Sequence, residues 1–532
     1  MTIEAPYYPI IYVRGYAATM GEIENTVATP YMGFNLGATK IRQNYDGEIK
    51  RFIFESPLIR LMKDEKYVDA YQNGDFIPED KPVPAKSVWI FRYYEPVSED
   101  LGDGEARTIP RFATDLREFI LRVCNQVCGD DVEARNKFKV YLVAHSMGGL
   151  ICRCYLQNIC RHGTRDAFGD AAEVRDKNEE LGLDGPLPAD PLVDKVFTYA
   201  TPHNGIEMAG LNVPDLGWLD RLHARNFNRK YMAEYLALPG GGGAVDSLSG
   251  TFPVDRFFCF VGTNYRDYGA FFGLSKKGTG PMSDGLVMME NASVKGAPRA
   301  FAHRSHSGHY GVVNSEEGYQ NLRRFLFGDV RVDVTLVVDE ITLPKAVEDK
   351  IGDNRERVKA AYNIDVSATM RGLNVFLNER RVIQESAIRR TYEELVHEQK
   401  SVYLFSGYLM KKAKTEGSRD TALAFAVDIG MKVPLYEIDK RFWFDDHFEG
   451  GDVFRDDITF YLRHTRDRTT VRYGLGSASG AGTAKTLLNP EDLGDGRLRF
   501  NLPLGFKENA ANKPKPGFRG MLQVTATPWN RE

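Results

Sequence analysis

The sequence predicts an α/β protein whose mostly parallel sheet, with helices on both faces, is followed by an all-β, sandwich-like C-terminal domain. Through residue 328, short apolar runs alternate with stretches that carry apolar residues at helical spacing. From residue 329 onward, alternation of apolar and polar residues replaces that pattern. The 532 residues also exceed what one hydrophobic core usually serves. We therefore expect two domains, 1–328 and 329–532.

Composition narrows the classes of function. With 42% hydrophobic and 27% charged residues, the chain has the balance of an ordinary globular protein. A net charge of −4 gives no electrostatic case for nucleic acid. No apolar run is long enough for a transmembrane segment. The first residues lack the basic and apolar regions of a signal peptide. The default expectation is a cytoplasmic protein, with signal-less secretion left open.

The six cysteines do not have the spacing of a disulfide framework or a zinc site. Cys124 and Cys128 lie one helical turn apart, and Cys152, Cys154 and Cys160 share one predicted helix. We expect buried free thiols.

The first elements of the predicted sheet flank a long insertion. Residues 9–13 are an apolar strand that runs into Arg14, Gly15 and Tyr16. Residues 20–83 are rich in glycine, aromatic and charged residues, and we expect an irregular cover or binding loop there. Residues 87–94 then predict a strand, and 109–127 a helix that packs on the sheet.

A serine stands between the next strand and helix. Residues 139–143 alternate and are rich in β-branched and aromatic residues, and the apolar run 150–160 is long enough for a helix. Ser146 lies between them, followed by Met147 and two glycines, so its hydroxyl would point out of a tight turn. The alternative is a βα turn without chemistry. The pattern is that of the nucleophile elbow of the α/β-hydrolases, with Ala144 where glycine is usual.

The elbow implies an oxyanion hole. In this class of protein, one amide follows the nucleophile and the other comes from the loop after an early strand. Those residues are Met147 and Tyr16. An ordinary glycine turn is the alternative for the stretch around Tyr16.

The rest of the first domain continues the alternation. Residues 163–191 are a polar surface excursion, and 206–252 hold an amphipathic stretch that is typical of a lid over an apolar pocket. A plain structural insertion is the alternative to the lid. Further strands are expected at 195–200, 256–261 and 299–303, and a closing helix at 316–326.

At least seven strands in the second domain predict an antiparallel sandwich. They are expected at 330–338, 363–369, 401–405, 422–433, 457–462, 497–501 and 521–526, and residues 475–484 form a Gly/Ser/Ala-rich loop.

A nucleophilic serine needs a base within hydrogen-bond reach and an acid that orients the base. In this fold the chain order is Ser, acid, His. His145 and His203 come too early and are better interpreted as structural. The base is therefore expected among the three histidines after the last strand of the sheet, His303, His306 and His309.

Two aspartates are candidates for the acid. Asp284 opens a Gly-Leu-Val turn that would hold its carboxylate fixed, whereas Asp267 lies in an aromatic context. Asp284 is the preferred candidate. A metal site on the three spaced histidines is the less favoured alternative, because Ser305, Ser307 and Gly308 are poor helix formers.

Several motifs resemble those of the bacterial triacylglycerol lipases and related esterases. The elbow Ala-His-Ser-Met-Gly-Gly and the segment Thr-Pro-His-Asn-Gly at 201–205 are similar to theirs. Ser-Asp-Gly-Leu-Val at 283–287 resembles their acid turn. His309-Tyr-Gly-Val-Val-Asn-Ser315 resembles the segment that supplies their base, which favours His309 over His306. The resemblance covers residues 8–327 in islands and does not extend to the C-terminal domain.

One residue departs from the resemblance. Arg14 replaces the histidine that precedes glycine in those lipases, and its guanidinium could bind an anionic group of the substrate. Aromatic residues such as Phe271 and Phe272 indicate a hydrophobic acyl pocket.

The sequence thus predicts a serine hydrolase of carboxylic esters, a lipase or esterase of lipid metabolism. The residues predicted for the site are Ser146, Asp284 and His309 as triad, His306 as alternative base, and Tyr16 and Met147 as oxyanion hole. No metal or other cofactor is expected, and the partners are an ester or lipid substrate with transient contact to a lipid interface. An acyltransferase, thioesterase or amidase would use the same triad. A non-catalytic lipid-binding or partner-binding protein is the alternative from another class.

Overall fold

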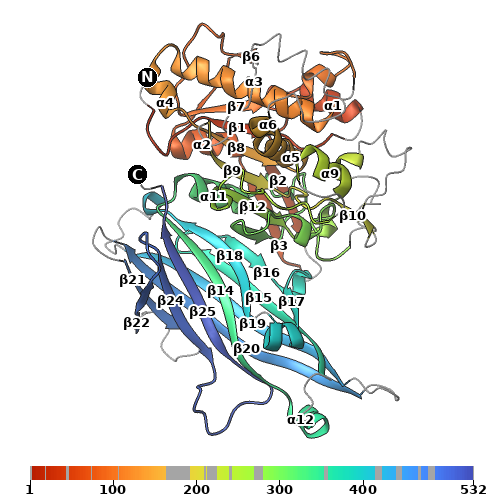
Figure 1. Cartoon of the computed structure of the whole chain (residues 1–532), viewed down its shortest axis with the longest axis vertical. Helices are drawn as coiled ribbons and strands as arrows, with labels where there is room; N and C mark the ends of the chain where they lie inside the picture. The colour runs from red at the N-terminus through yellow and green to blue at the C-terminus, as the bar shows by residue number, and fades with distance from the viewer. Residues whose placement is uncertain are drawn as a thin grey trace. The chain divides into compact units, whose positions relative to one another are not determined.

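The computed structural model of the whole chain divides into two compact units. The first comprises residues 1–299 and 304–326, and the second 300–303 and 327–532. Figure 1 draws both. The structure describes residues 3–17, 20–43, 47–72, 75–105, 107–162, 192–208, 211–212, 224–238, 243–268, 280–352, 358–398, 400–413, 422–438, 446–464, 469–476 and 486–530.

A seven-stranded sheet is the framework of the first unit, although residues 300–302 of its edge strand β13 are grouped with the second unit. Its spatial order is β13-β12-β9-β8-β1-β7-β4, and the pairs of β1 with β7 and β8, of β9 with β8 and β12, and of β4 with β7 are parallel. The central strands are buried along nearly their whole length, because helices and loops cover both faces. The strands are β1 Ile10–Val13, β4 Val68–Asp69, β7 Ser87–Phe91, β8 Val140–His145, β9 Val193–Tyr199, β12 Phe257–Gly262 and β13 Arg299–Ala302.

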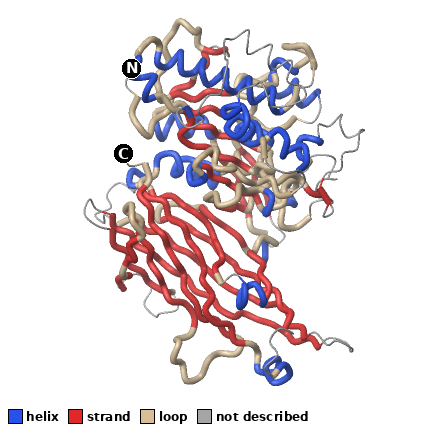
Figure 2. The backbone as a smooth tube through the Cα atoms, viewed as in Figure 1, coloured by secondary structure: helices blue, strands red, loops and turns tan. Residues whose placement is uncertain are grey.

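Helices alternate with these strands, as Figure 2 shows in blue and red. The longest, α3 Ile109–Cys128, begins at Thr108, whose hydroxyl accepts a hydrogen bond from the Arg111 amide, and ends before Gly129 at φ +53°. Helix α5 Met147–Cys154 follows β8 directly and continues through a π-helical turn, 155–159, into α6 Cys160–His162. Further helices of this part are α4 Val132–Lys137, α9 Arg229–Tyr235 and α11 Glu316–Phe327.

This topology is the α/β-hydrolase fold. Each strand is followed by a connection that returns to the same edge, and the strand order reverses between β1 and β8. Ser146 follows the central strand β8, Asp284 follows β12 and the histidine loop follows β13. Nucleophile, acid and histidines therefore emerge from the carboxyl ends of strands of one sheet. The predicted fold class is confirmed.

The expectation of an irregular segment at residues 20–83 is wrong. Helix α1 Met20–Val27, a hairpin of β2 Ala38–Gln43 and β3 Ile49–Phe54, and helix α2 Pro57–Glu65 lie there. Two very short strands, β5 Tyr71–Gln72 and β6 Asp75–Phe76, pair nearby. The sequence pattern did not predict this hairpin, because charged residues interrupt the alternation of apolar and polar residues in its strands. The predicted excursion at 163–191 lies outside the described residues.

Two antiparallel sheets form the second unit. One has the order β18-β14-β25-β24-β23, and the other β16-β15-β19-β20-β21-β22, with β17 beside β15. The strands are β14 Val330–Thr342, β15 Val358–Met370, β16 Phe376–Arg380, β17 Ile388–Thr391, β18 Ser401–Leu409, β19 Leu423–Ile438, β20 Asp446–His464, β21 Thr469–Leu475, β22 Thr486–Leu488, β23 Pro490–Asp492, β24 Leu498–Gly505 and β25 Gly517–Pro528, with helix α12 Lys345–Ile351.

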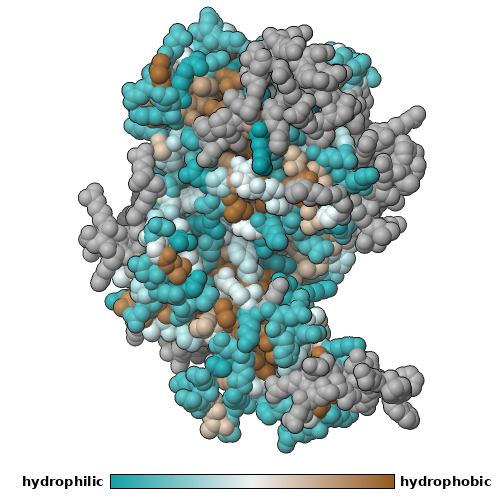
Figure 3. All heavy atoms as spheres, in the orientation of Figure 1, coloured by the Kyte–Doolittle hydropathy of each residue, from teal (hydrophilic) through white to brown (hydrophobic). Residues whose placement is uncertain are grey.

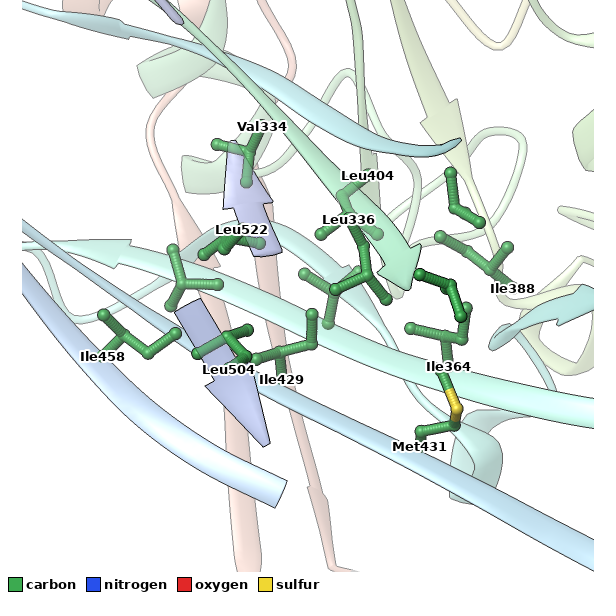
Figure 4. Packing of buried hydrophobic residues seen from close by; sticks show 14 of the residues in the cluster. Val334, Leu336, Ile364, Ile388, Leu404, Ile429, Met431, Ile458, Leu504 and Leu522 are labelled. Atoms are coloured by element: carbon green, nitrogen blue, oxygen red, sulfur yellow. The ribbon is translucent and has the colours of Figure 1, made fainter. Parts of the chain in front are cut away.

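The two sheets share one hydrophobic core. Strand β14 alternates buried and half-buried residues, so that one face of the sheet is apolar. Figure 4 shows the packing: Val334 and Leu336 of β14 lie in the same cluster as Ile364 of β15 and Ile429 of β19. Buried side chains that two antiparallel sheets direct at each other make a sandwich, as predicted.

Three global features agree with the composition. All six cysteines are buried and free, as predicted. Among the described helices, none is long and apolar enough to cross a membrane. The face drawn in Figure 3 is mostly hydrophilic, with small hydrophobic areas between.

Candidate active site

Ser146 occupies the sharp turn between β8 and α5. Its backbone lies at φ +52° and ψ −125°, a conformation that is costly for any residue with a side chain. The Ser146 amide donates a hydrogen bond to the Tyr199 carbonyl at 2.9 Å, which ties the turn to β9. The surrounding sheet thus holds the strained turn and directs the hydroxyl into the site. Only 3% of the residue is exposed.

Only glycine fits at positions 148 and 149, directly after the elbow, because neighbouring atoms occupy the place of a side chain. A Cβ on Gly148 would lie 2.4 Å from the Val13 carbonyl oxygen, and one on Gly149 would lie 2.2 Å from the Thr201 hydroxyl. Real Cβ atoms do not approach so closely. Thr201 occupies this position because its hydroxyl donates to the Ser146 carbonyl at 2.8 Å. Helix α5 can therefore approach β1 and the loop after β9 only through glycine.

Gly148→Ala is expected to lower esterase turnover by at least about tenfold and to destabilise the fold. The added methyl group meets backbone carbonyls of residues 13 and 14, which cannot rotate away. The measurement is p-nitrophenyl ester turnover together with the thermal unfolding midpoint. Gly308→Ala is the control, because nothing lies within 4 Å of a Cβ there, although its φ of +84° makes a small cost of strain expected. Equal turnover of Gly148→Ala and wild type would contradict the steric account.

Asp284 is buried and held by its own turn. Its Oδ1 accepts hydrogen bonds from the amides of Leu286 and Val287, at 3.0 and 2.8 Å. Its Oδ2 lies 2.8 Å from Nδ1 of His306. Gly285 adopts φ +99°, which gives the turn its shape. The carboxylate is therefore fixed with one oxygen aimed at an imidazole.

His306 lies between Asp284 and Ser146. Its Nδ1 faces the carboxylate, and its Nε2 lies 2.9 Å from the Ser146 hydroxyl oxygen. A carboxylate only accepts, so we assign the proton to Nδ1, which leaves Nε2 to accept from the hydroxyl. The His306 amide also donates to the Asp284 carbonyl at 3.0 Å, which fixes the backbone of the histidine against the acid turn.

The expectation for His309 is corrected. His309 is exposed on a turn, whereas His306 is 3% exposed and contacts both other residues of the array. The loop closes on itself, because the Ser305 amide donates to the Tyr310 carbonyl and the Val312 amide to the Ser305 carbonyl. Gly308 and His309, at the tip of this loop, are exposed. The alternative base from the sequence, His306, is the one that the geometry brings to Ser146.

His145, expected to be only structural, supports the histidine loop. Its Nε2 lies 2.9 Å from the His306 carbonyl oxygen, and because a carbonyl only accepts, Nε2 must carry the proton. Gly15 makes room for the ring, since a Cβ there would lie 2.8 Å from Nδ1 of His145. Burial, together with repulsion from His306 and Arg14, lowers the pKa of His145 to about 3. The ring is therefore a neutral donor. His203 is buried with Nε2 3.0 Å from the Thr198 hydroxyl, in agreement with a structural role.

The depressed pKa of His145 predicts a pH dependence of stability. An unfolded histidine gains a proton near pH 6.5, whereas folded His145 gains one only near pH 3. Its contribution to stability is therefore fully present above pH 6.5 and is lost as the pH falls toward 3. We expect the unfolding midpoint of wild type, relative to His145→Gln, to fall between pH 7.5 and 4.5. A difference that stays constant over this range would contradict the assignment.

Two tyrosines position the loop after β1. The Tyr93 hydroxyl lies within donating distance of the carbonyls of Arg14, at 2.9 Å, and Gly15, at 3.3 Å. The Ala17 amide donates to the Tyr94 hydroxyl at 2.8 Å. Both tyrosines are buried. The backbone on either side of Tyr16 is thus bound, and a Cβ on Gly15 would lie 2.7 Å from that of Ser146. The loop and the elbow are neighbours.

The residues predicted for the oxyanion hole lie on helix α5 and on the loop after β1. Met147 is the first residue of α5 and is buried, with its sulfur 4.0 Å from the Asn226 side-chain amide. The ring of Tyr16 meets Phe227 edge-on, with centroids 5.9 Å apart. The Arg14 guanidinium donates to the Met32 carbonyl, so its substrate contact stays a prediction. Phe271 and Phe272 lie outside the described residues.

Asp267, the alternative acid, has another partner. Arg42 donates to both of its oxygens, at 2.6 and 3.1 Å, and Asn264 adds a third hydrogen bond. Its neighbour Tyr268 places its ring 5.4 Å from the His306 ring, edge-on. Asp267 therefore anchors the β2–β3 hairpin beside the histidine loop.

The described part of the expected lid is tied to the elbow helix. The Tyr235 carbonyl of α9 accepts from Cys154 and Asn158, at 3.2 and 3.0 Å. Arg153, fully buried, donates to the carbonyls of Val245 and Ser247. Residues 209–210, 213–223 and 239–242 of this segment lie outside the described residues. The role of this segment as a lid stays a prediction.

The site can move the Ser146 proton to Nε2 of His306, while the Asp284 carboxylate holds the proton on Nδ1. Within the ranges that the structure describes, no group of three or more His, Cys, Asp or Glu side chains could hold a metal ion. The metal alternative on the three histidines has no such group to support it.

Comparison with known proteins yields likeness of structure only. No protein-family model and no curated protein matches the chain. The chain is similar to phospholipase PlaB from Legionella pneumophila, solved in complex with thio-NAD, at 12% identity and TM-score 0.30, over 83% of this chain and 89% of that one. It is also similar to a gene product of Listeria innocua, at 12% identity and TM-score 0.23, over 60% of this chain and 93% of that one. At TM-scores this low, neither likeness informs on substrate or reaction.

Proposed function

We propose that the protein is a serine hydrolase that cleaves carboxylic esters through an acyl-enzyme. The observation that carries the proposal is the pair of contacts of one imidazole, His306 Nδ1 to Asp284 at 2.8 Å and Nε2 to Ser146 at 2.9 Å. Both distances are those of hydrogen bonds in a nucleophile, base and acid array. The strained turn of Ser146 adds support, because backbone strain of this kind is concentrated at functional sites.

In the first half of the reaction, the Ser146 hydroxyl adds to the ester carbonyl while its proton moves to Nε2 of His306. Asp284 keeps Nδ1–H in place and stabilises the imidazolium. The tetrahedral intermediate collapses when His306 returns the proton to the leaving alcohol. Water then adds to the acyl-enzyme by the same path, and the carboxylic acid is released.

The oxyanion of the intermediate is proposed to bind the amides of Met147 and Tyr16. Met147 stands at the start of α5, where backbone amides point out of the helix. Tyr93 and Tyr94 fix the backbone on either side of Tyr16. The aromatic rings of Tyr16, Phe227 and Tyr268 near the site favour an apolar acyl group.

The test is turnover of p-nitrophenyl esters with acyl chains from acetate to palmitate, for wild type and Ser146→Ala. We expect turnover by wild type only, and the chain-length profile distinguishes esterase from lipase. Thioester and anilide substrates are measured in parallel. Turnover restricted to one of these would replace the ester assignment, and turnover retained by Ser146→Ala would overturn the proposed mechanism.

A further inference from the structure

The β2–β3 hairpin presents two different faces. Directly opposed residues share a face, so Thr39, Ile41 and Gln43 lie with Ile53, Arg51 and Ile49. All six are exposed, and the three isoleucines are 60–66% exposed. The opposite face carries Phe52, half-buried, and Phe54, buried. The outer face therefore exposes three isoleucines, whereas the two phenylalanines lie on the inner face (β2 and β3 in Figure 1).

The inner face packs on the loops beside the site. Phe52 meets Tyr310 edge-on at 4.7 Å, and Arg304 lies over the Phe52 ring at 5.0 Å. Arg42 lies over the rings of Phe52 and Tyr310 and binds Asp267. Tyr310 and Arg304 flank His306 in the chain, and Asp267 precedes the tyrosine that contacts the His306 ring. The hairpin is thus attached to both loops next to Ser146.

The outer face combines apolar side chains with one cation, Arg51, which stands opposite Ile41. Lys40 and Lys50, both exposed, belong by register to the opposite face, where they pair with Phe52 and Arg42. Within 38–54 there are four basic and two acidic residues, a surplus of two positive charges in a chain of net charge −4. Exposed branched apolar residues between cations match a surface with acyl chains under anionic head groups. Such isoleucines would be costly to leave in water.

We propose that this face docks the first unit onto an anionic phospholipid surface. The isoleucines enter the boundary between head groups and acyl chains, and Arg51 contacts the anionic head groups. The exposed charges of Lys40 and Lys50, on the other face of the same hairpin, add long-range attraction to the anionic surface. The inference deepens the proposed function, on which it rests for its purpose, because docking would bring the entrance of the site to an ester-rich interface. Binding itself needs no catalysis.

The experiment measures cosedimentation of the full-length protein with vesicles of phosphatidylcholine alone or with 30% phosphatidylglycerol. All variants are made on Ser146→Ala, so that hydrolysis does not alter the vesicles. Ile41→Thr/Ile49→Thr/Ile53→Thr keeps β-branched residues and removes apolar surface. Lys40→Glu/Arg51→Glu reverses the charge. The matched controls are Val132→Ser, 70% exposed on α4, and Lys295→Glu, exposed elsewhere on the first unit.

We expect the partition coefficient on anionic vesicles to fall at least about tenfold in the isoleucine variant, and about as much in the charge variant, since tenfold corresponds to about 1.4 kcal/mol. The controls should bind like the parent, and salt should weaken binding. Failure of the parent to bind, or binding of both hairpin variants as strong as that of the parent, would overturn the proposal. So would a dimer in sedimentation equilibrium that the isoleucine variant dissolves, because the face would then bind a second copy.

The docking proposal and the proposed function fail separately. If the protein that keeps Ser146 binds vesicles but does not turn over esters, the docking proposal stands and the proposed hydrolase function is wrong. Turnover of soluble esters without vesicle binding does the reverse. The three isoleucine substitutions are also made in a chain that keeps Ser146. Its turnover of soluble esters should match wild type, which would show that the hairpin change leaves the site intact.

Discussion

Replacing His306 with alanine is expected to lower kcat for a soluble ester by about four orders of magnitude or more. The imidazole is the only group in contact with both the Ser146 hydroxyl and the Asp284 carboxylate among the residues that the structure describes. Without it, the hydroxyl has no base and remains a weak nucleophile at neutral pH. Steady-state kinetics measure the loss, and circular dichroism checks the fold.

His309→Ala is the matched control for that prediction. Its side chain is exposed on a turn three residues further along, so kcat should stay within about twofold of wild type. Loss of activity in His309→Ala with activity retained in His306→Ala would restore the assignment that the motif resemblance favoured.

Asp284→Asn has the second largest expected effect, a loss of about 10⁴-fold in kcat with little change in KM. One oxygen accepts two backbone amides and the other faces Nδ1–H of His306. An amide group must place its NH₂ against one of these donors. The imidazole would then favour the tautomer with the proton on Nε2, which cannot accept from Ser146.

Asp267→Asn separates the two candidate acids. Asp267 binds Arg42 and Asn264 and does not contact His306, so we expect less than a tenfold loss on soluble esters. Equal losses in the two variants, or a loss confined to Asp267→Asn, would contradict the role proposed for Asp284. Ester kinetics at a single pH suffice.

The order of apolar and polar residues predicted the central strands and the elbow, because each of these elements is encoded by residues that are adjacent in the chain. Buried parallel strands appear as short apolar runs, and the runs at 139–143 and 195–200 correspond to β8 and β9 within one or two residues at each end. The elbow needs a strand, a serine and small residues in sequence, and all three are adjacent in the chain. The alternation after residue 328 likewise follows from sheets with one buried face.

The base could not be chosen from spacing. His306 and His309 lie three residues apart in a loop without helical or strand periodicity, so no pattern says which one faces Ser146. The choice depends on a hydrogen bond from the His306 amide to the Asp284 carbonyl, between residues 22 positions apart. The resemblance to lipase motifs favoured His309, which is exposed.

Motifs also did not predict the residues that support the loops of the site. Tyr93 and Tyr94 act on the loop after β1 from a neighbouring strand end, and His145 acts on His306 across 161 positions. The hairpin at 38–54 was missed because its exposed isoleucines stand between charged residues and its partners are two distant loops. These contacts are tertiary, and only the fold brings them together.

The most direct test of the central claim is labelling by a fluorophosphonate, followed by intact mass and peptide mapping. A serine activated by His306 reacts with the probe, and the account predicts one adduct on Ser146 in wild type and His309→Ala. It predicts no adduct in Ser146→Ala and labelling slowed at least about a hundredfold in His306→Ala. An adduct on another serine, or no labelling of folded wild type, would contradict the claim that Ser146 is an activated nucleophile.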